Sequence, residues 1–331
     1  MARRVPNCAV RPARAVRRFG IALAVMAGVL AGVAASPSPV VAGPLAGWAA
    51  PAAIPSAMTH AQAPALTEYD GLLYAAWAGE SSPYHLWYST FNGSSWSGQA
   101  EVPSALTNYE TGPAIAVYDG KLYVVWQGEG APSELWYSTF NGSTWSSQSE
   151  LTSAQAFNSS ISGLAVYDGD LYLSWLNDSY GISYSAFNGS TWSSVATVPS
   201  ALGHNFESDD VPLAVYNGDL FVSWESSTSE LMYSDFNGAT WTSPQSLGMM
   251  SDAGPALATF GTKLYAAFND YSALHVVYST FNGTTWTAAK NVRGARYQVE
   301  TGPGIADYNG SIYVAWLPTF DPSPIDYSSK T

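Results

Sequence analysis

The strongest constraint in this sequence is a unit that recurs six times between residue 44 and the C-terminus. A complete unit has a short apolar segment, a segment ending in Trp, a Tyr-Ser segment and a Phe-Asn-Gly-x-x-Trp hairpin. The aromatic residue ending the second segment recurs every 44 to 49 residues, at Trp77, Trp126, Trp175, Trp224, Phe268 and Trp316. A period of this length indicates a repeat architecture, which has to be interpreted before any local motif.

Each unit predicts four short strands. In the second unit these strands, A to D, are Ala114–Tyr118, Lys121–Trp126, Glu134–Phe140 and Thr144–Leu151. Asp119-Gly120 and Asn141-Gly142 predict tight hairpin turns, since Asn, Asp and Gly tolerate the positive φ that such turns require. No stretch of the sequence that is long enough to form a helix has helical periodicity. Four strands per unit of this length predict all-β, antiparallel propeller blades.

The two ends of the repeat region complement each other. The last unit stops soon after Tyr327 and lacks its hairpin and fourth strand. A matching tryptophan, Trp48, lies 21 residues before Tyr69, close to the spacing of the other hairpin tryptophans. We therefore expect residues 48–55 to complete the last blade and close a ring, which removes both exposed sheet edges. The predicted fold is a single six-bladed β-propeller domain over residues 44–331.

Residues 1–43 have the pattern of a secretory signal peptide and leader. Six arginines between Arg3 and Arg18 form a basic region, and an apolar stretch of 15 residues follows from Ile21 to Ala35. Small residues suited to cleavage come next. The stretch is short for a membrane span, which needs about 20 residues. We expect a secreted protein without a membrane span.

Without this leader, the chain carries 6 Lys or Arg against 25 Asp or Glu, a net charge of −19. Such a charge repels phosphate backbones, so nucleic acid is not an expected partner. The sole cysteine, Cys8, lies in the leader, which excludes a disulfide, a cysteine-ligated metal or a thiol nucleophile. Loop carboxylates could bind Ca²⁺, but no Asp-x-Asp-x-Asp loop supports it, and no cofactor is predicted. We expect a monomer.

The recurring tryptophans are interpreted as packing residues between blades. The hairpin from Ser138 to Trp145 resembles a degenerate Asp box, the repeat of sialidases and related propellers. Its serine, glycine, threonine and tryptophan match, but Phe140 stands where that family has its aspartate. The resemblance implies a structural turn and no catalytic role.

Function is expected on the loops that connect strands B to C and D to A, because binding residues are usually carried on loops held by a rigid frame. Carboxylates there could accept hydrogen bonds from sugar hydroxyls, and Trp87 and Trp136 begin Trp-Tyr-Ser in the first two units only. The candidate ligand-binding residues are Glu80, Trp87, Glu110, Glu129, Trp136, His204, Asp210, Arg296, Tyr297 and Glu300. The alternative for each carboxylate is a solvated acidic surface that keeps the protein soluble.

Two loops break the repeat. Residues 202–211 include His204 and Asp210, and residues 292–300 include Arg296, Tyr297 and Glu300. Arg293 and Arg296 are the only arginines after the leader.

In size, closure and aromatic-rich blades, the chain resembles bacterial and fungal β-propeller lectins, including the six-bladed fucose-binding type. The resemblance implies several sugar sites between blades on the face of the B–C and D–A loops. That family uses an Arg, a Glu and a Trp in each pocket. Arg296 with Glu300 matches this pattern at one pocket at most. The sequence therefore departs from the residue pattern of the fucose-binding family, and the resemblance does not imply fucose specificity.

The predicted function is therefore glycan binding, with no catalytic residue assigned. One alternative is a protein-interaction or adhesion propeller. Another is a glycoside hydrolase, which needs two carboxylates about 5 to 10 Å apart. A sialidase is set aside, because that family clamps its substrate with three arginines from different blades. Neither Gly-x-Ser-x-Gly nor His-Glu-x-x-His occurs.

Overall fold

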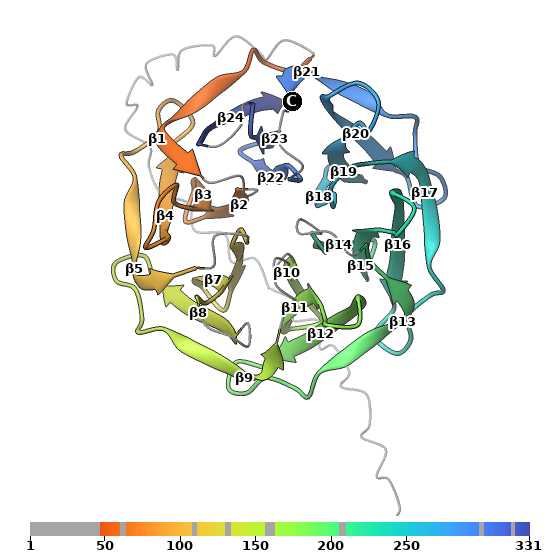
Figure 1. The fold of residues 1–331 in the computed structure, drawn as a ribbon, viewed down its shortest axis with the longest axis horizontal. Coiled ribbons are helices and arrows are strands. Elements are labelled where there is room, and N and C mark those ends of the chain that lie inside the picture. The colour runs from red at the N-terminus through yellow and green to blue at the C-terminus, as the bar shows by residue number, and fades with distance from the viewer. Residues whose placement is uncertain are drawn as a thin grey trace, which may run out of the picture. The chain divides into compact units, whose positions relative to one another are not determined.

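The computed structural model describes residues 47–59, 64–107, 111–129, 134–155, 163–204, 210–297, 301–318 and 322–331, with only the backbone for 153–155. These residues form six antiparallel sheets of four strands each, arranged in a ring around a central channel (Figure 1). The described part contains no helix. The predicted all-β, six-bladed propeller is confirmed.

The first three blades follow one another in sequence, and each runs from its innermost to its outermost strand. Blade 1 consists of β2 (Ala65–Tyr69), β3 (Leu72–Ala78), β4 (His85–Phe91) and β5 (Ala100–Leu106). Blade 2 consists of β6 (Ala114–Tyr118), β7 (Lys121–Gln127), β8 (Glu134–Phe140) and β9 (Ser149–Gln155). Blade 3 consists of β10 (Gly163–Tyr167), β11 (Asp170–Leu176), β12 (Gly181–Phe187) and β13 (Ala196–Leu202).

The remaining blades repeat this order, except that the last blade takes its outermost strand from the start of the propeller. Blade 4 consists of β14 (Leu213–Tyr216), β15 (Asp219–Glu225), β16 (Glu230–Phe236) and β17 (Gln245–Met250). Blade 5 consists of β18 (Ala256–Phe260), β19 (Lys263–Asn269), β20 (His275–Phe281) and β21 (Lys290–Arg296). Blade 6 consists of β22 (Gly304–Tyr308), β23 (Ser311–Trp316), β24 (Ser323–Lys330) and β1 (Ala52–Thr59).

Ring closure follows the prediction from the two chain ends. Strand β1 pairs antiparallel with β24, with Ala52 opposite Tyr327. Trp48 forms a further bridge to Lys330. The closing strand starts four residues later than the predicted segment and extends to Thr59, because residues 48–51 add only that isolated bridge.

In five of the six blades, the turn between strands A and B is of the predicted type. The first residues of these turns, Asp70, Asp119, Asp168, Asn217 and Asn309, have φ between 46° and 52°, and a glycine with positive φ follows each. The turns between strands C and D differ from the prediction. At Asn141-Gly142, only the glycine has positive φ, 89°. The Asn141 side-chain oxygen instead accepts hydrogen bonds from the backbone N–H groups of Ser143 and Thr144, at 3.0 and 2.9 Å.

Strand D of blade 2 also begins later than predicted. The hairpin around Trp145 adds one isolated bridge between Phe140 and Trp145, and the strand itself, β9, starts at Ser149. The predicted bounds of 144–151 were therefore wrong, since the hairpin residues before Ser149 form only that one bridge and do not belong to the ladder.

The core is built from two aromatic layers. The strand-B residues Trp77, Trp126, Trp175, Trp224, Phe268 and Trp316 are at most 1 % exposed. Each hairpin tryptophan instead packs against the strand-C tyrosine of the preceding blade, as in the edge-to-face pair of Trp145 and Tyr88, whose ring centroids lie 5.5 Å apart. Trp48 makes the same contact with Tyr278 at 5.4 Å. The recurring tryptophans are therefore packing residues, as predicted.

Deleting the closing strand should destabilise the whole ring. A chain lacking residues 47–59 loses the pairing of β1 with β24 and the Trp48–Tyr278 contact, and leaves the edge of β24 exposed. We expect a lower unfolding temperature and aggregation, measured by calorimetry and light scattering. A chain that starts at Gly47 is the control. Equal stability of the two chains would contradict this account of closure.

Candidate functional site

A pocket of about 240 Å³ lies between blades 6 and 1, where β1 meets the first B–C loop. We call it the Trp87 pocket. It is lined by Ser56, Met58, Gly79, Glu80, Ser81, Ser82, Pro83, His85, Trp87 and Gln99. The structure thus brings together two predicted site residues, Glu80 and Trp87, at a boundary between blades.

Trp87 is partly exposed at this boundary. Trp87 lies opposite Trp77 on β3 and opposite Glu101 on β5, and residues paired in this way share one face of the sheet. Trp77 is fully buried, whereas Trp87 stays partly exposed. Across the boundary, Ser56 has a φ of 62° within a register irregularity of β1, and such irregularities re-aim side chains.

Gly79 makes room for this indole. A Cβ atom at Gly79 would lie 2.8 Å from Nε1 and 3.0 Å from Cδ1 of Trp87. Blade 2 repeats the arrangement, since a Cβ at Gly128 would lie 2.8 Å from both Nε1 and Cδ1 of Trp136. Any residue larger than glycine at these two positions would therefore occupy the space that the tryptophan fills.

Blade 3 shows what fills this space when the tryptophan is absent. The corresponding residues there are Asn177 and Ser183, and the Asn177 amide donates a hydrogen bond of 2.8 Å to the Ser183 hydroxyl. Glycine and tryptophan occur together at these two positions in blades 1 and 2 only. The pair is therefore a coupled departure from the repeat.

The polar groups beside the two tryptophans are not the same. In blade 1, His85 Nδ1 lies 2.7 Å from Glu101 Oε1, and both side chains are more than one-third exposed. The corresponding residues in blade 2 are Glu134 and Glu150. Glu80 is exposed on the pocket wall in blade 1. Glu129, at the same position of the unit, is exposed in blade 2.

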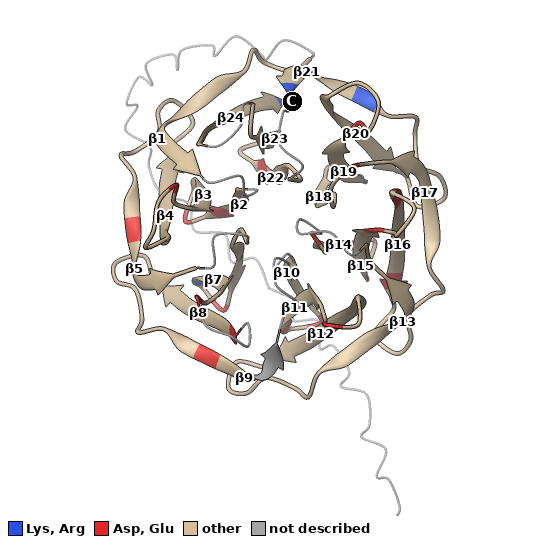
Figure 2. Ribbon diagram, in the orientation of Figure 1, with Lys and Arg blue, Asp and Glu red and all other residues tan. Residues whose placement is uncertain are grey.

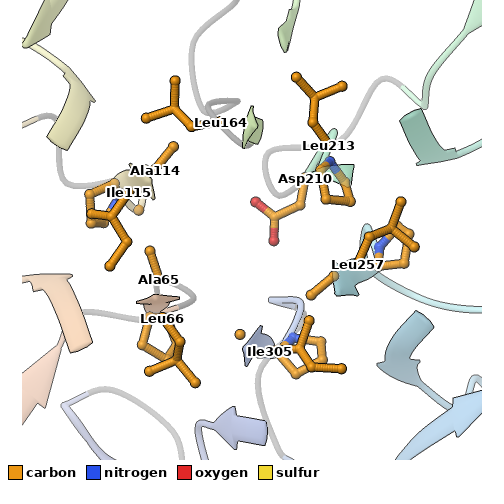
Figure 3. Close-up of a pocket in the computed structure, with 17 residues that line it drawn as sticks. Ala65, Leu66, Ala114, Ile115, Leu164, Asp210, Leu213, Leu257 and Ile305 are labelled. Atoms are coloured by element: carbon orange, nitrogen blue, oxygen red, sulfur yellow. The ribbon is translucent and has the colours of Figure 1, made fainter. Parts of the chain in front are cut away.

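Asp210 lies elsewhere, in the central channel. Its carboxyl points toward the middle of a cavity of about 100 Å³ ringed by apolar side chains of the inner strands (Figure 3). Gly302 gives it room, since a Cβ there would lie 2.8 Å from Asp210 Oδ2. The residue keeps intermediate exposure to the channel, yet the carboxyl is deep enough that burial raises its pKa to about 8.

The other predicted residues are dispersed. Tyr297 is 2 % exposed, and its hydroxyl donates a 2.6 Å hydrogen bond to Asp252 Oδ2. Arg296 is exposed at the end of β21. His204 Nδ1 lies 3.9 Å from Glu225 Oε1, and burial lowers the pKa of this histidine. Glu110 and Glu300 lie outside the described residues.

Acidic residues occur on several blades, while basic residues are most visible on β21 (Figure 2). Within the described ranges, no three or more His, Cys, Asp or Glu side chains gather in an arrangement that could hold a metal ion. The same part of the chain has no helix with the length and apolar character needed to cross a membrane. The Trp87 pocket therefore offers an indole, a carboxylate and hydroxyl groups without a metal cluster.

Eight of the ten lining residues of this pocket were not predicted, among them Ser56, Gly79, His85 and Gln99. Gly79 could have been found, because Gly79 and Gly128 stand two residues after the strand-B tryptophan only in the units that contain Trp-Tyr-Ser. Ser56 and Gln99 reach the pocket through ring closure and a hairpin, which sequence spacing does not reveal.

The arrangement of the sheets defines this chain as a six-bladed β-propeller with four antiparallel strands in each blade. No protein-family model matches this sequence, and no curated protein matches it either. AofleA from Arthrobotrys oligospora has a similar structure, with a TM-score of 0.60 and 11% identity over 84% of this chain and 85% of that one. The fucose-recognising, six-bladed Aleuria aurantia lectin has a TM-score of 0.57 and 14% identity over 69% and 79% of the two chains.

A Trypanosoma rangeli sialidase bound to the inhibitor DANA is also similar, with a TM-score of 0.59 and 11% identity over 82% of this chain and 55% of that one. This chain therefore spans about half the length of the sialidase. At identities of 11 to 14%, these similarities establish a shared propeller fold.

Asp210 should make stability depend on pH. Its pKa in the folded protein, about 8, lies above the value of about 3.9 expected in the unfolded chain. The folded state therefore binds the proton more tightly, and the free energy of unfolding should fall by up to about 1.4 kcal/mol per pH unit between these two values. We expect Asp210→Asn to reduce this decline and to raise the unfolding temperature near pH 8.

The measurement is thermal unfolding between pH 4 and 9. Asp178→Asn, at an exposed loop carboxylate, is the control and should leave the profile unchanged. An identical decline in wild type and Asp210→Asn would show that Asp210 is not the titrating group.

Proposed function

We propose that this protein is a secreted glycan-binding propeller whose sugar sites are the Trp87 pocket and its counterpart around Trp136. The observation that carries the proposal is the pairing of Gly79 with Trp87 and of Gly128 with Trp136. In a unit that repeats six times, the glycine and the tryptophan occur together in two blades only, and the indole is partly exposed in both.

The chemistry of the Trp87 pocket suits a neutral sugar. An indole can pack on the apolar face of a pyranose ring, because aromatic rings combine a large apolar surface with defined geometry. Beside it, the Glu80 carboxylate, the serine hydroxyls and the Gln99 amide line the same pocket and can pair with sugar hydroxyls. A volume of about 240 Å³ admits one or two sugar residues.

Two further observations support the proposal. Structural neighbours include lectins, and the Aleuria aurantia protein recognises fucose, so fucose is a natural first probe. Two similar sites on one rigid ring would also gain avidity on a ligand that presents several copies of its sugar. Secretion rests on the leader pattern of residues 1–43.

The test replaces the glycine–tryptophan pair by the residues that blade 3 uses. In the double variants Gly79→Asn/Trp87→Ser and Gly128→Asn/Trp136→Ser, the hydrogen bond seen between Asn177 and Ser183 can form again. We expect folding close to that of wild type and a loss of about tenfold or more in affinity at the altered site, as for other buried aromatic anchors. Affinity is measured by calorimetry with sugars that a glycan array identifies.

Tyr271→Ala is the matched aromatic control, because this tyrosine is 60 % exposed on the B–C loop of blade 5. The array is run with calcium and with chelator, so that a metal requirement appears as lost binding. Saturable binding that both double variants retain would place the sugar elsewhere on the propeller. A blank array would reject glycan binding, and assays for hydrolysis and for protein partners would then decide between the alternatives.

A further inference from the structure

A second pocket lies on the face of the tight turns, between blades 4 and 5. We call it the Asp235 pocket. It has a volume of about 340 Å³ and is lined by Tyr216, Asn217, Asp219, Phe221, Tyr233, Asp235, Gln245, Phe281, Gly283 and Thr284. None of the predicted site residues lies in it, and its size is within the range of small-molecule sites.

The strand register places two carboxylates on one wall. Asp235 on β16 lies directly opposite Phe221 on β15, and Asp219 lies two residues before Phe221 on the same face. The two aspartates are therefore diagonal neighbours, with a separation of about 7–8 Å or somewhat less expected between such positions. Thr242 fixes one of them, because its hydroxyl donates a 3.0 Å hydrogen bond to Asp235 Oδ1.

The aromatic wall of the pocket comes from both blades. The ring of Phe281 in blade 5 packs against Tyr216, Phe221 and Tyr233 in blade 4, at centroid distances of 6.0, 5.9 and 5.9 Å. All four rings are less than 9 % exposed. The Tyr233 hydroxyl donates a hydrogen bond to the Gln245 side chain at 3.1 Å, which holds this amide at the rim.

Blade 4 departs from the other five blades at these positions. The residue corresponding to Phe221 is tyrosine in every other blade, namely Tyr74, Tyr123, Tyr172, Tyr265 and Tyr313. The residue corresponding to Asp235 is small or neutral in every other blade, namely Thr90, Thr139, Ala186, Thr280 and Ser329. Since Phe221 and Asp235 lie directly opposite one another, the blade loses one hydroxyl and gains a carboxylate at a single point.

The charge of the pocket is one-sided. Asp219 and Asp235 both line it, while no lysine or arginine is among its lining residues. Carboxylates partly removed from water favour a positively charged partner. The amide and hydroxyl groups of Asn217, Gln245 and Thr284 complete a rim that can pair with hydroxyl groups.

We propose that the Asp235 pocket binds an amino sugar, with the protonated amine between Asp219 and Asp235. The ring hydroxyls then pair with the amide rim, and the apolar ring face rests against the aromatic wall. This site does not depend on the Trp87 pocket, because it lies on the opposite face and uses different blades.

The experiment titrates the mature protein with D-glucosamine and measures binding by calorimetry and ligand-observed NMR. We expect saturable binding with one site per chain that weakens as salt is added. Glucose and N-acetylglucosamine lack the charge and should bind at least about tenfold more weakly, since hydrogen bonds to charged groups are the stronger ones. Equal binding of all three sugars would overturn the proposal, and so would a lack of glucosamine binding.

Two variants restore the residues of other blades and should therefore fold. Asp235→Thr removes one carboxylate and should weaken glucosamine binding about tenfold or more. Phe221→Tyr returns a hydroxyl directly opposite Asp235, where it competes with the amine for this carboxylate, and should weaken binding as well. Asp170→Ser is the control, because Asp170 occupies the position of Asp219 in blade 3, where its diagonal neighbour is Ala186 instead of a second acid. Unchanged affinity in Asp235→Thr would overturn the proposal.

The double variant Gly79→Asn/Trp87→Ser separates the two sites. It should bind glucosamine as wild type does, whether or not the Trp87 pocket binds a sugar. Loss of glucosamine binding in this variant would show that the sugar binds in the Trp87 pocket instead, and would overturn the proposal.

Discussion

The structure depends on one contact that is made six times around the ring. A tryptophan at the hairpin of one blade packs edge to face against the strand-C tyrosine of the blade before it, and Trp48 makes this contact with Tyr278 where the ring closes. Aromatic pairs of this kind contribute about 0.5–1.5 kcal/mol beyond the area they bury. Because the sixth contact comes from the other end of the chain, the ring is complete only when both ends are in place. Both pockets lie between blades and therefore depend on this arrangement.

The repeat also provides an internal reference for function. Residues that hold blades together recur, as the buried strand-B aromatics do. A coupled departure at two positions in contact needs a different explanation. Gly79 with Trp87 is one such departure, and Phe221 with Asp235 is another. In the first pair, the glycine makes space for the tryptophan. In the second pair, the two residues lie directly opposite one another on neighbouring strands.

Much of the fold could be predicted from the sequence. The inner strand β6 and the strand β8 have the predicted bounds, and the closing role of Trp48 follows from spacing alone. The start of β9 could not be predicted in this way, because the hairpin around Trp145 forms one isolated bridge and does not belong to the ladder. The role of Asn141 was also misjudged, since its side chain caps the turn while Gly142 alone takes the positive φ.

The sites were less predictable than the fold, because they depend on contacts between blades. Glu80 and Trp87 line the same pocket. This could be predicted, because the positions of both residues within the repeated unit lie toward the same face of the ring. The His85–Glu101 contact and the approach of Ser56 depend on irregular register in the outer strands. Asp210 was predicted on the binding surface, but the chain turns inward before β14 and carries its carboxyl into the channel.

Ring closure and ligand binding are linked at the Trp87 pocket. Ser56 and Met58 come from β1, which joins blade 6 through its pairing with β24, whereas Glu80 and Trp87 belong to blade 1. A ligand that contacts both sides of this boundary binds the closed ring and not an opened one. Binding then adds to the stability of the closed state in proportion to the logarithm of ligand concentration above its dissociation constant. The Gly128–Trp136 pair lies within blade 2, whose four strands are consecutive in sequence, so a sugar bound there would not depend on ring closure in this way.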